Sequence, residues 1–396
     1  TESSSDVLQQ DDWRAVMRRN PELWKVMLAS GLKRSSIAVA STLGIQNLRA
    51  MVWKEHTAQY TAALSMCLNI LGMTAGGIFG RFGDTVGRKP AAIVFGLTGF
   101  LPAWALLVFG FNEMGLWASC VGSVLSGFAV SSDALLVLAN DIVLVQDRAI
   151  TFGLFMASTN LISFVFFGLP AFFITLLKVI PNPSITVWMT YMFVLSVAYF
   201  LIVFLIREPA PTSMPDENAA NGEIDNMEIT TTSSQPSRGR EIAKGHGLAA
   251  LMRSLPVISE LNLLCENGNL KHLFLVATLL AFSGDIVFDL GSQYFRGELG
   301  ILNGGNLDQQ QVVSVLTTLP PEILIIPGAM VVGLLGREWG SLALLKFLIP
   351  MSALFTASGA VLHLVPRVWV VGVVCVANNY AALAGTVPLK HLVAAA

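Results

Sequence analysis

The chain has 396 residues, of which 54% are hydrophobic and only 13% are charged, and its formal net charge at pH 7 is −2. Soluble domains carry about 25% charged residues, so this composition excludes one large soluble core and favours a membrane protein. The near-neutral charge also excludes nucleic acid as an expected partner.

Cysteines and histidines show no pattern of a metal, disulfide or cofactor site. No two cysteines stand in a CxxC spacing, and three of the four lie in apolar runs (Cys67, Cys120, Cys265, Cys375). The five histidines are scattered along the chain. We therefore expect no metal and no cofactor. The polar start carries no signal peptide, and the first residue is Thr, so we expect the chain to be incomplete.

Long apolar runs dominate the chain after a polar segment at 1–27. A helix needs roughly 20 apolar residues to cross a hydrocarbon layer of ~30 Å. By this criterion the sequence predicts ten spans, at about 28–50, 60–80, 90–110, 116–139, 150–175, 185–206, 272–293, 311–335, 341–364 and 367–388. The first contains Lys33 and Arg34, which suits a helix lining an aqueous cavity and would equally suit a mistaken gene model.

A polar connector divides these spans into two sets. Residues 207–247 are rich in Pro, Ser, Thr, Asn and Glu and bury too little apolar surface to offset their chain entropy, which predicts disorder. The expected organisation is an N-terminal segment, a six-helix bundle, a central loop and an incomplete bundle of four spans (1–27, 28–206, 207–270, 271–396).

Basic residues predict the orientation. Orientation follows from the Lys and Arg count in short loops: with the N-terminus inside, ten fall on the inner side and five on the outer side. The inner set is Arg14, Arg18, Arg19, Lys25, Arg81, Arg88, Lys89, Arg148, Arg207 and Arg337; the outer set is Arg49, Lys54, Lys178, Arg296 and Arg367. We expect a multi-pass protein with its N-terminus and central loop in the cytoplasm, in a membrane that the sequence does not name.

A charged stretch with regularly placed glycines lies between the second and third spans. It reads Gly80-Arg81-Phe82-Gly83-Asp84-Thr85-Val86-Gly87-Arg88-Lys89, and we expect it to turn in water between two apolar helices. It resembles the loop signature of the major facilitator superfamily, Gly-x-x-x-Asp-x-x-Gly-Arg-Lys/Arg, although Thr85 stands where the family usually has a basic residue. A worn copy follows span eight at Leu334-Leu335-Gly336-Arg337-Glu338-Trp339-Gly340.

The resemblance implies a two-bundle, all-α transporter with twelve spans, of which a truncated chain would retain about ten. The region around Asn140-Asp141-Ile142, Arg148 and Phe152-Gly153-Leu154 is similar to the drug and tetracycline efflux branch and to hippocampus-abundant-transcript-like proteins. That branch implies a cytoplasmic cluster of gating charges. Its members here are Gly80, Asp84, Gly87, Arg88, Lys89, Asp141 and Arg148, which would also serve topology alone.

Carboxylates inside the spans are candidate sites for a proton or for the solute, since a charge at mid-bilayer costs roughly 2.5–3.5 kcal/mol and usually faces a cavity. Asp133, Asp285 and Glu322 are these candidates, and Asp285 is preferred. Asn160, Asn378 and Asn379 would line the cavity or form hydrogen bonds between helices.

The sequence thus predicts a secondary transporter that moves a small organic solute by alternating access, with proton-coupled export preferred. Its expected partners are that solute, protons and the lipid bilayer. A uniporter, a symporter and a carrier-derived receptor remain alternatives. The run Gly168-Leu169-Pro170 departs from the Gly-Pro-x-x-Gly-Gly run of proton-coupled antiporters and weakens that assignment. A membrane enzyme is disfavoured because the histidines do not cluster.

Overall fold

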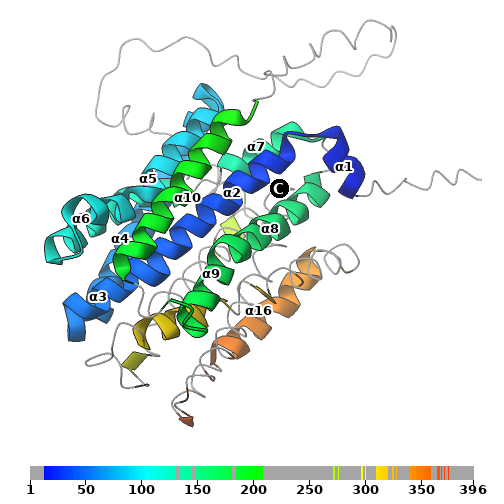
Figure 1. Ribbon diagram of the computed structural model, residues 1–396. Helices are drawn as coiled ribbons and strands as arrows, with labels where there is room; N and C mark the ends of the chain where they lie inside the picture. The colour runs from blue at the N-terminus through cyan, green and yellow to red at the C-terminus, as the bar shows by residue number, and fades with distance from the viewer. Residues whose placement is uncertain are drawn as a thin grey trace, which may run out of the picture.

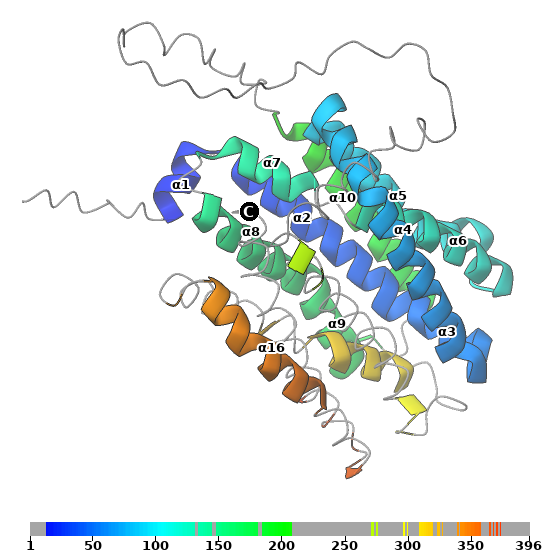
Figure 2. The same ribbon diagram turned by 180° about the vertical axis from the view of Figure 1, so that it is seen from behind.

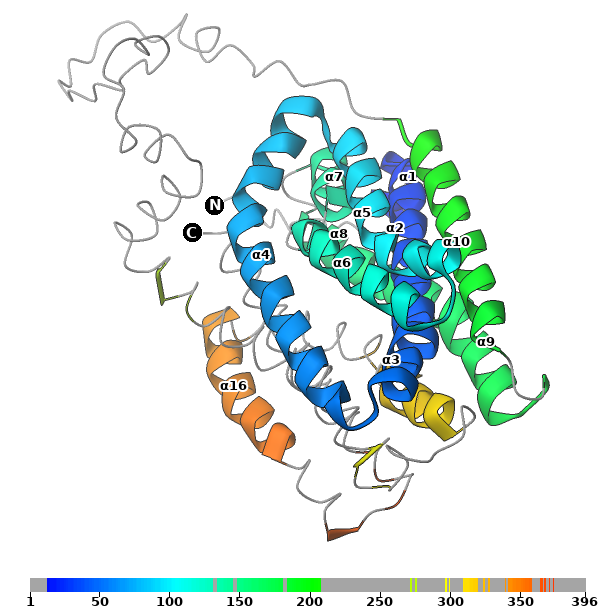
Figure 3. The same ribbon diagram turned by 90° about the vertical axis from the view of Figure 1, so that its left-hand side faces the viewer.

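The computed structural model describes residues 13–130, 134–144, 148–180 and 184–207 and, in the C-terminal part, 271–272, 275, 296–297, 299, 309–319, 323–324, 327, 339, 341–357, 364–365, 367, 370 and 373. Every regular element within these residues is a helix, as the all-α prediction requires. Several helices run lengthwise beside one another, and α16 (Ser341–Ala357) lies on the side of the molecule away from α5 and α10 (Figures 1 and 3).

The first predicted span is a helix that starts earlier than its apolar run. After α1 (Trp13–Arg19) come α2 (Leu23–Ala38), a π-helical stretch η1 (Val39–Ile45) and α3 (Gln46–Trp53). The sequence predicted a start near residue 28, but Leu23 and Val26 are fully buried in the core. Packing of these apolar side chains therefore extends the helix into the polar segment at 1–27.

The predicted turn at 80–89 is almost entirely helical, which corrects the prediction. A short 3₁₀ turn, η2 (Lys54–His56), precedes α4 (Thr57–Val86). Helix α4 continues through most of the signature, and α5 (Arg88–Phe109) begins two residues after α4 ends. Gly87 alone makes the turn, with φ of 113°. Such a φ strains any residue that has a Cβ, so this glycine is the one that the turn requires.

The next spans follow their predicted positions closely. Helices α6 (Glu113–Val130) and α7 (Ala134–Ile142) cover the fourth span, and α7 ends at the predicted Asn140-Asp141-Ile142. The fifth span is α8 (Arg148–Ser163), η4 (Phe164–Gly168), α9 (Leu169–Ala171) and η5 (Phe172–Leu176). The sixth is α10 (Ile185–Leu205).

Helix α2 lies against α8 and α10 (Figures 1 and 2). Glycines permit the close approach of this span: a Cβ on Gly31 of α2 would collide with Ile162 of α8, and a Cβ on Gly44 of η1 would collide with Met189 of α10. Ser36 also donates a hydrogen bond of 3.1 Å from Oγ to the carbonyl of Met192. Small residues at helix contacts are the usual means of close packing in membranes.

A buried tyrosine joins α10 to α5. The Tyr199 hydroxyl donates a 2.6 Å hydrogen bond to the Ala92 carbonyl, and Gly96 leaves room for its ring. The ring packs edge-to-face on Phe100 at a centroid distance of 5.5 Å. Edge-to-face pairs of this kind contribute about 0.5–1.5 kcal/mol beyond their buried area.

The outer surface of the helices suits lipid. Among the described residues three helices are long and apolar enough to span a membrane: Arg88–Phe109, Thr151–Leu176 and Ile185–Leu205. In α10 the side of Val194, Leu201 and Phe204 is exposed although it is as apolar as the buried side, and all three are more than half exposed. Such a helix is hydrophobic on every face, as a lipid-facing span must be. The count of ten spans stays a prediction.

Candidate functional site

Charged side chains gather where four helix ends meet: the starts of α2 and α5 and the ends of α7 and α10. We call this the Arg88 end, and define it by Glu22, Lys25, Arg88, Lys89, Asp141 and Arg207. Three of its members come from the predicted cluster, namely Arg88, Lys89 and Asp141. The other three were not predicted as site residues.

Arg88 and Asp141 form an ion pair between α5 and α7. Arg88 Nε donates to Asp141 Oδ2 at 3.0 Å, and the side chains keep 25% and 39% of their accessible surface. The sequence placed both residues on one side of the membrane, and the structure brings them into contact across 53 positions. An ion pair this exposed contributes about 0.2–1 kcal/mol, because water screens both charges.

Both charges of this pair lie at the helix ends that disfavour them. Arg88 is the first residue of α5, whose N-terminus carries partial positive charge, and Asp141 lies in the last turn of α7, whose C-terminus carries partial negative charge. Each alone is disfavoured by about 0.3–1 kcal/mol. In the pair each charge offsets the unfavourable interaction of the other with its own helix end. The net contact between α5 and α7 is therefore weak, and it depends on both partners.

Gly83 of α4 leaves room for the guanidinium group of Arg88. A Cβ on Gly83 would lie 3.1 Å from Arg88 Nη1, so the arginine side chain lies directly over this buried glycine of α4. Gly83 belongs to the signature stretch but was not among the predicted site residues. In the structure it lets the side chain of α5 lie against α4.

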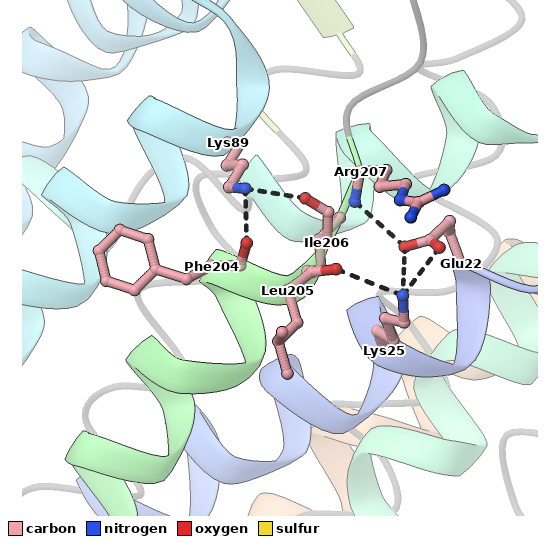
Figure 4. Close-up of polar contacts among 7 residues, drawn as sticks. All are labelled: Glu22, Lys25, Lys89, Phe204, Leu205, Ile206 and Arg207. Atoms are coloured by element: carbon pink, nitrogen blue, oxygen red, sulfur yellow. Dashed lines mark hydrogen bonds and ion pairs between the residues drawn. The ribbon is translucent and has the colours of Figure 1, made fainter.

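Lysines from two helix starts bind the free carbonyls at the end of α10 (Figure 4). Lys89 Nζ donates to the carbonyls of Phe204 and Ile206 at 2.8 and 2.9 Å. Lys25 Nζ donates to the carbonyl of Leu205 at 3.3 Å. The last carbonyls of a helix have no partner inside it, and cations are favoured there. These bonds tie the starts of α2 and α5 to the end of α10.

Glu22 completes the contact on the other side of Lys25 (Figure 4). Lys25 Nζ donates to both carboxylate oxygens at 2.8 and 3.0 Å, and the backbone N–H of Arg207 donates to Oε2 at 3.1 Å. The hydrogen bond from Lys25, with a smaller contribution from the N–H of Arg207, lowers the pKa of the Glu22 carboxyl. The sequence signal for this residue was available: Pro21-Glu22 directly precedes an apolar run, as at many helix starts.

The remaining predicted residues divide into three groups. Gly80 and Asp84 lie inside α4 and Arg148 is the first residue of α8, with the side chains of Asp84 and Arg148 outside the description. Gly87 is the turn described above. Outside the described residues lie Asp133, Asp285, Glu322, Asn378 and Asn379.

Asn160 is fully buried in α8 and donates within its own helix, from Nδ2 to the Met156 carbonyl at 2.7 Å. Within the described part of the chain its Oδ1 has no hydrogen-bond partner, and the same holds for the hydroxyls of its buried neighbours Thr159 and Ser163. Most buried polar atoms in proteins have a partner, so three without one within about one turn of α8 form a distinct polar strip. We call Thr159, Asn160 and Ser163 the α8 strip.

The described residues therefore show groups that position helices. Within the described part of the chain no three metal-ligating side chains gather. The Arg88 end holds an ion pair and ammonium groups on helix carbonyls, which are contacts that form and break without covalent chemistry.

Comparison with solved structures gives the same architecture. The structure of the proton:xylose symporter XylE bound to 6-bromo-6-deoxy-D-glucose is similar with a TM-score of 0.50 and 13% identity, covering 96% of this chain and 87% of that one. A partially occluded, inward-open structure of the xylose transporter XylE from E. coli has a TM-score of 0.48 and 12% identity, covering 96% and 89%. At 13% identity the likeness to the symporter structure with a TM-score of 0.50 concerns the fold alone. No curated protein matches the chain.

Residues 24–393 match the sequence profile of the Major Facilitator Superfamily, which is nearly the whole chain. This family consists of membrane transporters of small solutes, so the family resemblance of the signature and the exclusion of an enzyme are confirmed. The chain therefore belongs to the Major Facilitator Superfamily and is a multi-pass, all-helical integral membrane protein that acts as a secondary transporter.

Proposed function

We propose that the chain exports a small organic solute in exchange for protons, by alternating access between two bundles at 28–206 and 271–396. The preference for export follows from the similarity of the region around Asp141 and Arg148 to the drug and tetracycline efflux branch. Transport follows from membership of the family, whereas the direction of transport and its coupling to protons are our proposal.

The observation that carries the proposal is the Arg88–Asp141 ion pair. It joins α5 and α7 with a free energy of about 0.2–1 kcal/mol, which a conformational change can supply and recover. A permanent structural clamp would instead use a buried, fully hydrogen-bonded pair. We therefore assign a gating role to the predicted cluster of Gly80, Asp84, Gly87, Arg88, Lys89, Asp141 and Arg148.

The Arg88 end is proposed to face the cytoplasm. The excess of Lys and Arg in the inner segments supports this orientation. Glu22 of the N-terminal segment contacts Arg207, the first residue after the sixth predicted span, so the N-terminal segment and the start of the central connector share one end. A topology that places Arg88 and residue 207 on the same side is consistent with that contact.

The α8 strip is proposed to border the solute path. It provides hydrogen-bonding oxygens inside an apolar bundle, at a place where burial without a partner costs about 1–3 kcal/mol for each group. A hydrogen-bonding solute passing between the bundles would relieve this cost. Asn378 and Asn379 are proposed to contribute from the second bundle.

Proton coupling is assigned to the carboxylates inside the spans, with Asp285 preferred over Asp133 and Glu322. Burial raises the pKa of a carboxyl, so such a group binds a proton on one side and releases it on the other. Asparagine at 285 keeps the size of the side chain and removes the titration.

The full chain in proteoliposomes tests this function. Vesicles enclosing a pH-sensitive dye are given an inward-directed or outward-directed pH gradient, and a panel of organic solutes is added. We expect one solute class to dissipate the gradient, Asp285→Asn to abolish this coupling, and Glu55→Gln on the exposed η2 turn to leave it unchanged. Coupled flux that persists in Asp285→Asn contradicts the proton assignment, and absence of flux for every solute contradicts transport.

A further inference from the structure

Three buried side chains from distant parts of the sequence meet at the end of the molecule opposite to Arg88. Arg296 Nη2 donates to Asn47 Oδ1 at 2.9 Å and to Ser314 Oγ at 2.7 Å, and Ser314 Oγ donates to Asn47 Oδ1 at 3.1 Å. All three are 0% exposed. Asn47 belongs to α3, whereas Arg296 and Ser314 follow the central connector, so the contact joins the two halves of the chain.

The contact lies far from the Arg88 end. Asn47 precedes α4, and Gly87 follows it. Helix α4 has 30 residues and spans roughly 45 Å at 1.5 Å per residue. Figure 3 shows α3 at one end of α4 and the start of α5 at the other. The two polar clusters therefore occupy opposite ends of the bundle, as gates on the two sides of a membrane must.

Arg296 is a buried cation whose hydrogen-bond partners among the described residues are neutral. No described residue accepts a hydrogen bond from its Nε or Nη1. A guanidinium stays protonated in proteins, and a buried charge without a carboxylate is strongly disfavoured. The closed contact thus stores an unfavourable term that hydration of Arg296 would remove on opening. This makes the contact reversible in a way that a buried ion pair would not be.

An apolar contact between the same halves lies beside the polar one. A Cβ on Gly168 of η4 would come within 2.9 Å of Leu319 Cδ1 and within 2.6 Å of Phe164 Cδ2. Val315 and Leu319 are buried in the same hydrophobic core as the helices of residues 13–207. Glycine at 168 therefore lets residues 309–319 pack closely on the fifth predicted span. Although Gly168-Leu169-Pro170 departs from the antiporter pattern, it keeps Gly168, the residue that this packing requires.

We infer that Asn47, Arg296 and Ser314, together with Gly168 and Leu319, form the gate at the end opposite to Arg88, and that this gate is closed in the present structure. The inference rests on the proposed alternating-access function and, with the proposed orientation, places this gate on the outer side. The hydrogen bonds of Arg296 hold it shut, and because its partners among the described residues are neutral, the closed state is not permanent.

Two substitutions of Asn47 should change the stability of the closed gate in opposite directions. Asn47→Ala removes an acceptor of Arg296 and leaves the cation with fewer partners, so the closed state is weakened. Asn47→Asp replaces a neutral partner of Arg296 with a carboxylate at the same place, so the closed state is strengthened. A merely structural asparagine would predict damage from both changes and no opposite effects.

Cysteine labelling in proteoliposomes measures the gate. Cys67, Cys120, Cys265 and Cys375 are replaced by serine, and Val315→Cys, which is buried between the halves, serves as the reporter for a membrane-impermeant maleimide added from outside. We expect Asn47→Ala to raise the labelling rate roughly tenfold, a factor that ~1.4 kcal/mol produces, and Asn47→Asp to lower it. Thr98→Ala, which removes a hydroxyl bonded within its own helix, is the matched control and leaves the rate unchanged.

The outcomes separate the gate from the proposed function. Equal labelling in Asn47→Ala, Asn47→Asp and the parent overturns the gate, even if proton-coupled flux is observed. Opposite effects on labelling support the gate, even if no solute dissipates the pH gradient. If the Asn47 variants do not fold, Gly168→Ala tests the same contact, since its methyl group wedges Leu319 away: faster labelling supports the gate and unchanged labelling overturns it.

Discussion

The Arg88–Asp141 ion pair allows a quantitative test of the gating cluster. Asp141→Asn removes an attraction of about 0.2–1 kcal/mol, because the side chains are 25% and 39% exposed. The same change removes a carboxylate from the C-terminal end of α7, which returns about 0.3–1 kcal/mol. The two effects nearly cancel, and the same balance applies to Arg88→Gln at the start of α5.

Each single substitution should therefore change the free energy of unfolding little, whereas the pair should show a coupling of about 0.2–1 kcal/mol in a double-mutant cycle. Unfolding by SDS in mixed micelles, followed by helical content, measures all four proteins. The coupling should fall toward zero at 1 M salt, where the screening length is about 3 Å. Arg88→Lys keeps the charge without the Nε–H that makes the bond, and is the control for pure charge attraction.

Two results would refute this reasoning. A coupling above about 3 kcal/mol would make the pair a permanent clamp of the kind found in buried, fully bonded sites, which does not suit a gate. A coupling that is absent even at low salt would mean that the two charges only set topology, the alternative that the sequence left open.

Three further predictions follow from single contacts. Gly87→Ala should destabilise the protein by about 1–3 kcal/mol, because the φ of 113° at this position strains any other residue. Gly153→Ala, whose Cβ would meet nothing within 4 Å, should be neutral or stabilising. Equal effects of the two substitutions in SDS unfolding would contradict the assignment of the turn. The lowered pKa of Glu22 contributes stability that is fully present above the usual pKa of 4.5 and is lost as the pH falls through the pKa of the folded protein. Glu22→Gln should therefore flatten the acid limb of a stability–pH profile, and an unchanged limb would refute the contact. Tyr199→Phe removes a buried hydrogen bond to the Ala92 carbonyl, which keeps its partner within α5, and should cost about 0.5–1.5 kcal/mol, while Tyr60→Phe on the exposed face of α4 should cost less than about 0.5 kcal/mol, and equal costs would contradict the role of that bond.

Local sequence patterns predicted the helices well where apolar length decides them. The sixth span was expected at 185–206 and α10 runs Ile185–Leu205. The signature at 80–89 misled, because charges and glycines indicate a turn by composition, whereas a helix tolerates glycine at a cost of about 1 kcal/mol when tertiary packing supports it. Of its three glycines only Gly87 adopts a positive φ, and sequence carries no sign of which one will.

The site residues were predictable to the extent that a motif names them. Arg88 and Asp141 were grouped from family resemblance and proved to be in contact at 3.0 Å. Lys89 was grouped with them, but its carbonyl partners at the end of α10 are set by how α5 and α10 pack. The contact between Asn47 and Arg296 joins residues 249 positions apart, and counting charges had placed Arg296 in a loop. Contacts at that separation depend on the tertiary fold.

Distances across both ends test the account most directly. Spin labels at Thr85→Cys and Ala343→Cys report the Arg88 end, and labels at Glu55→Cys and Gln309→Cys report the Asn47 end, since all four positions are exposed. Double electron–electron resonance in lipid nanodiscs between about pH 8 and pH 5.5 should show reciprocal shifts, with one pair separating as the other approaches. Distances that stay fixed at both ends, or that lengthen together, would contradict alternating access between two gates.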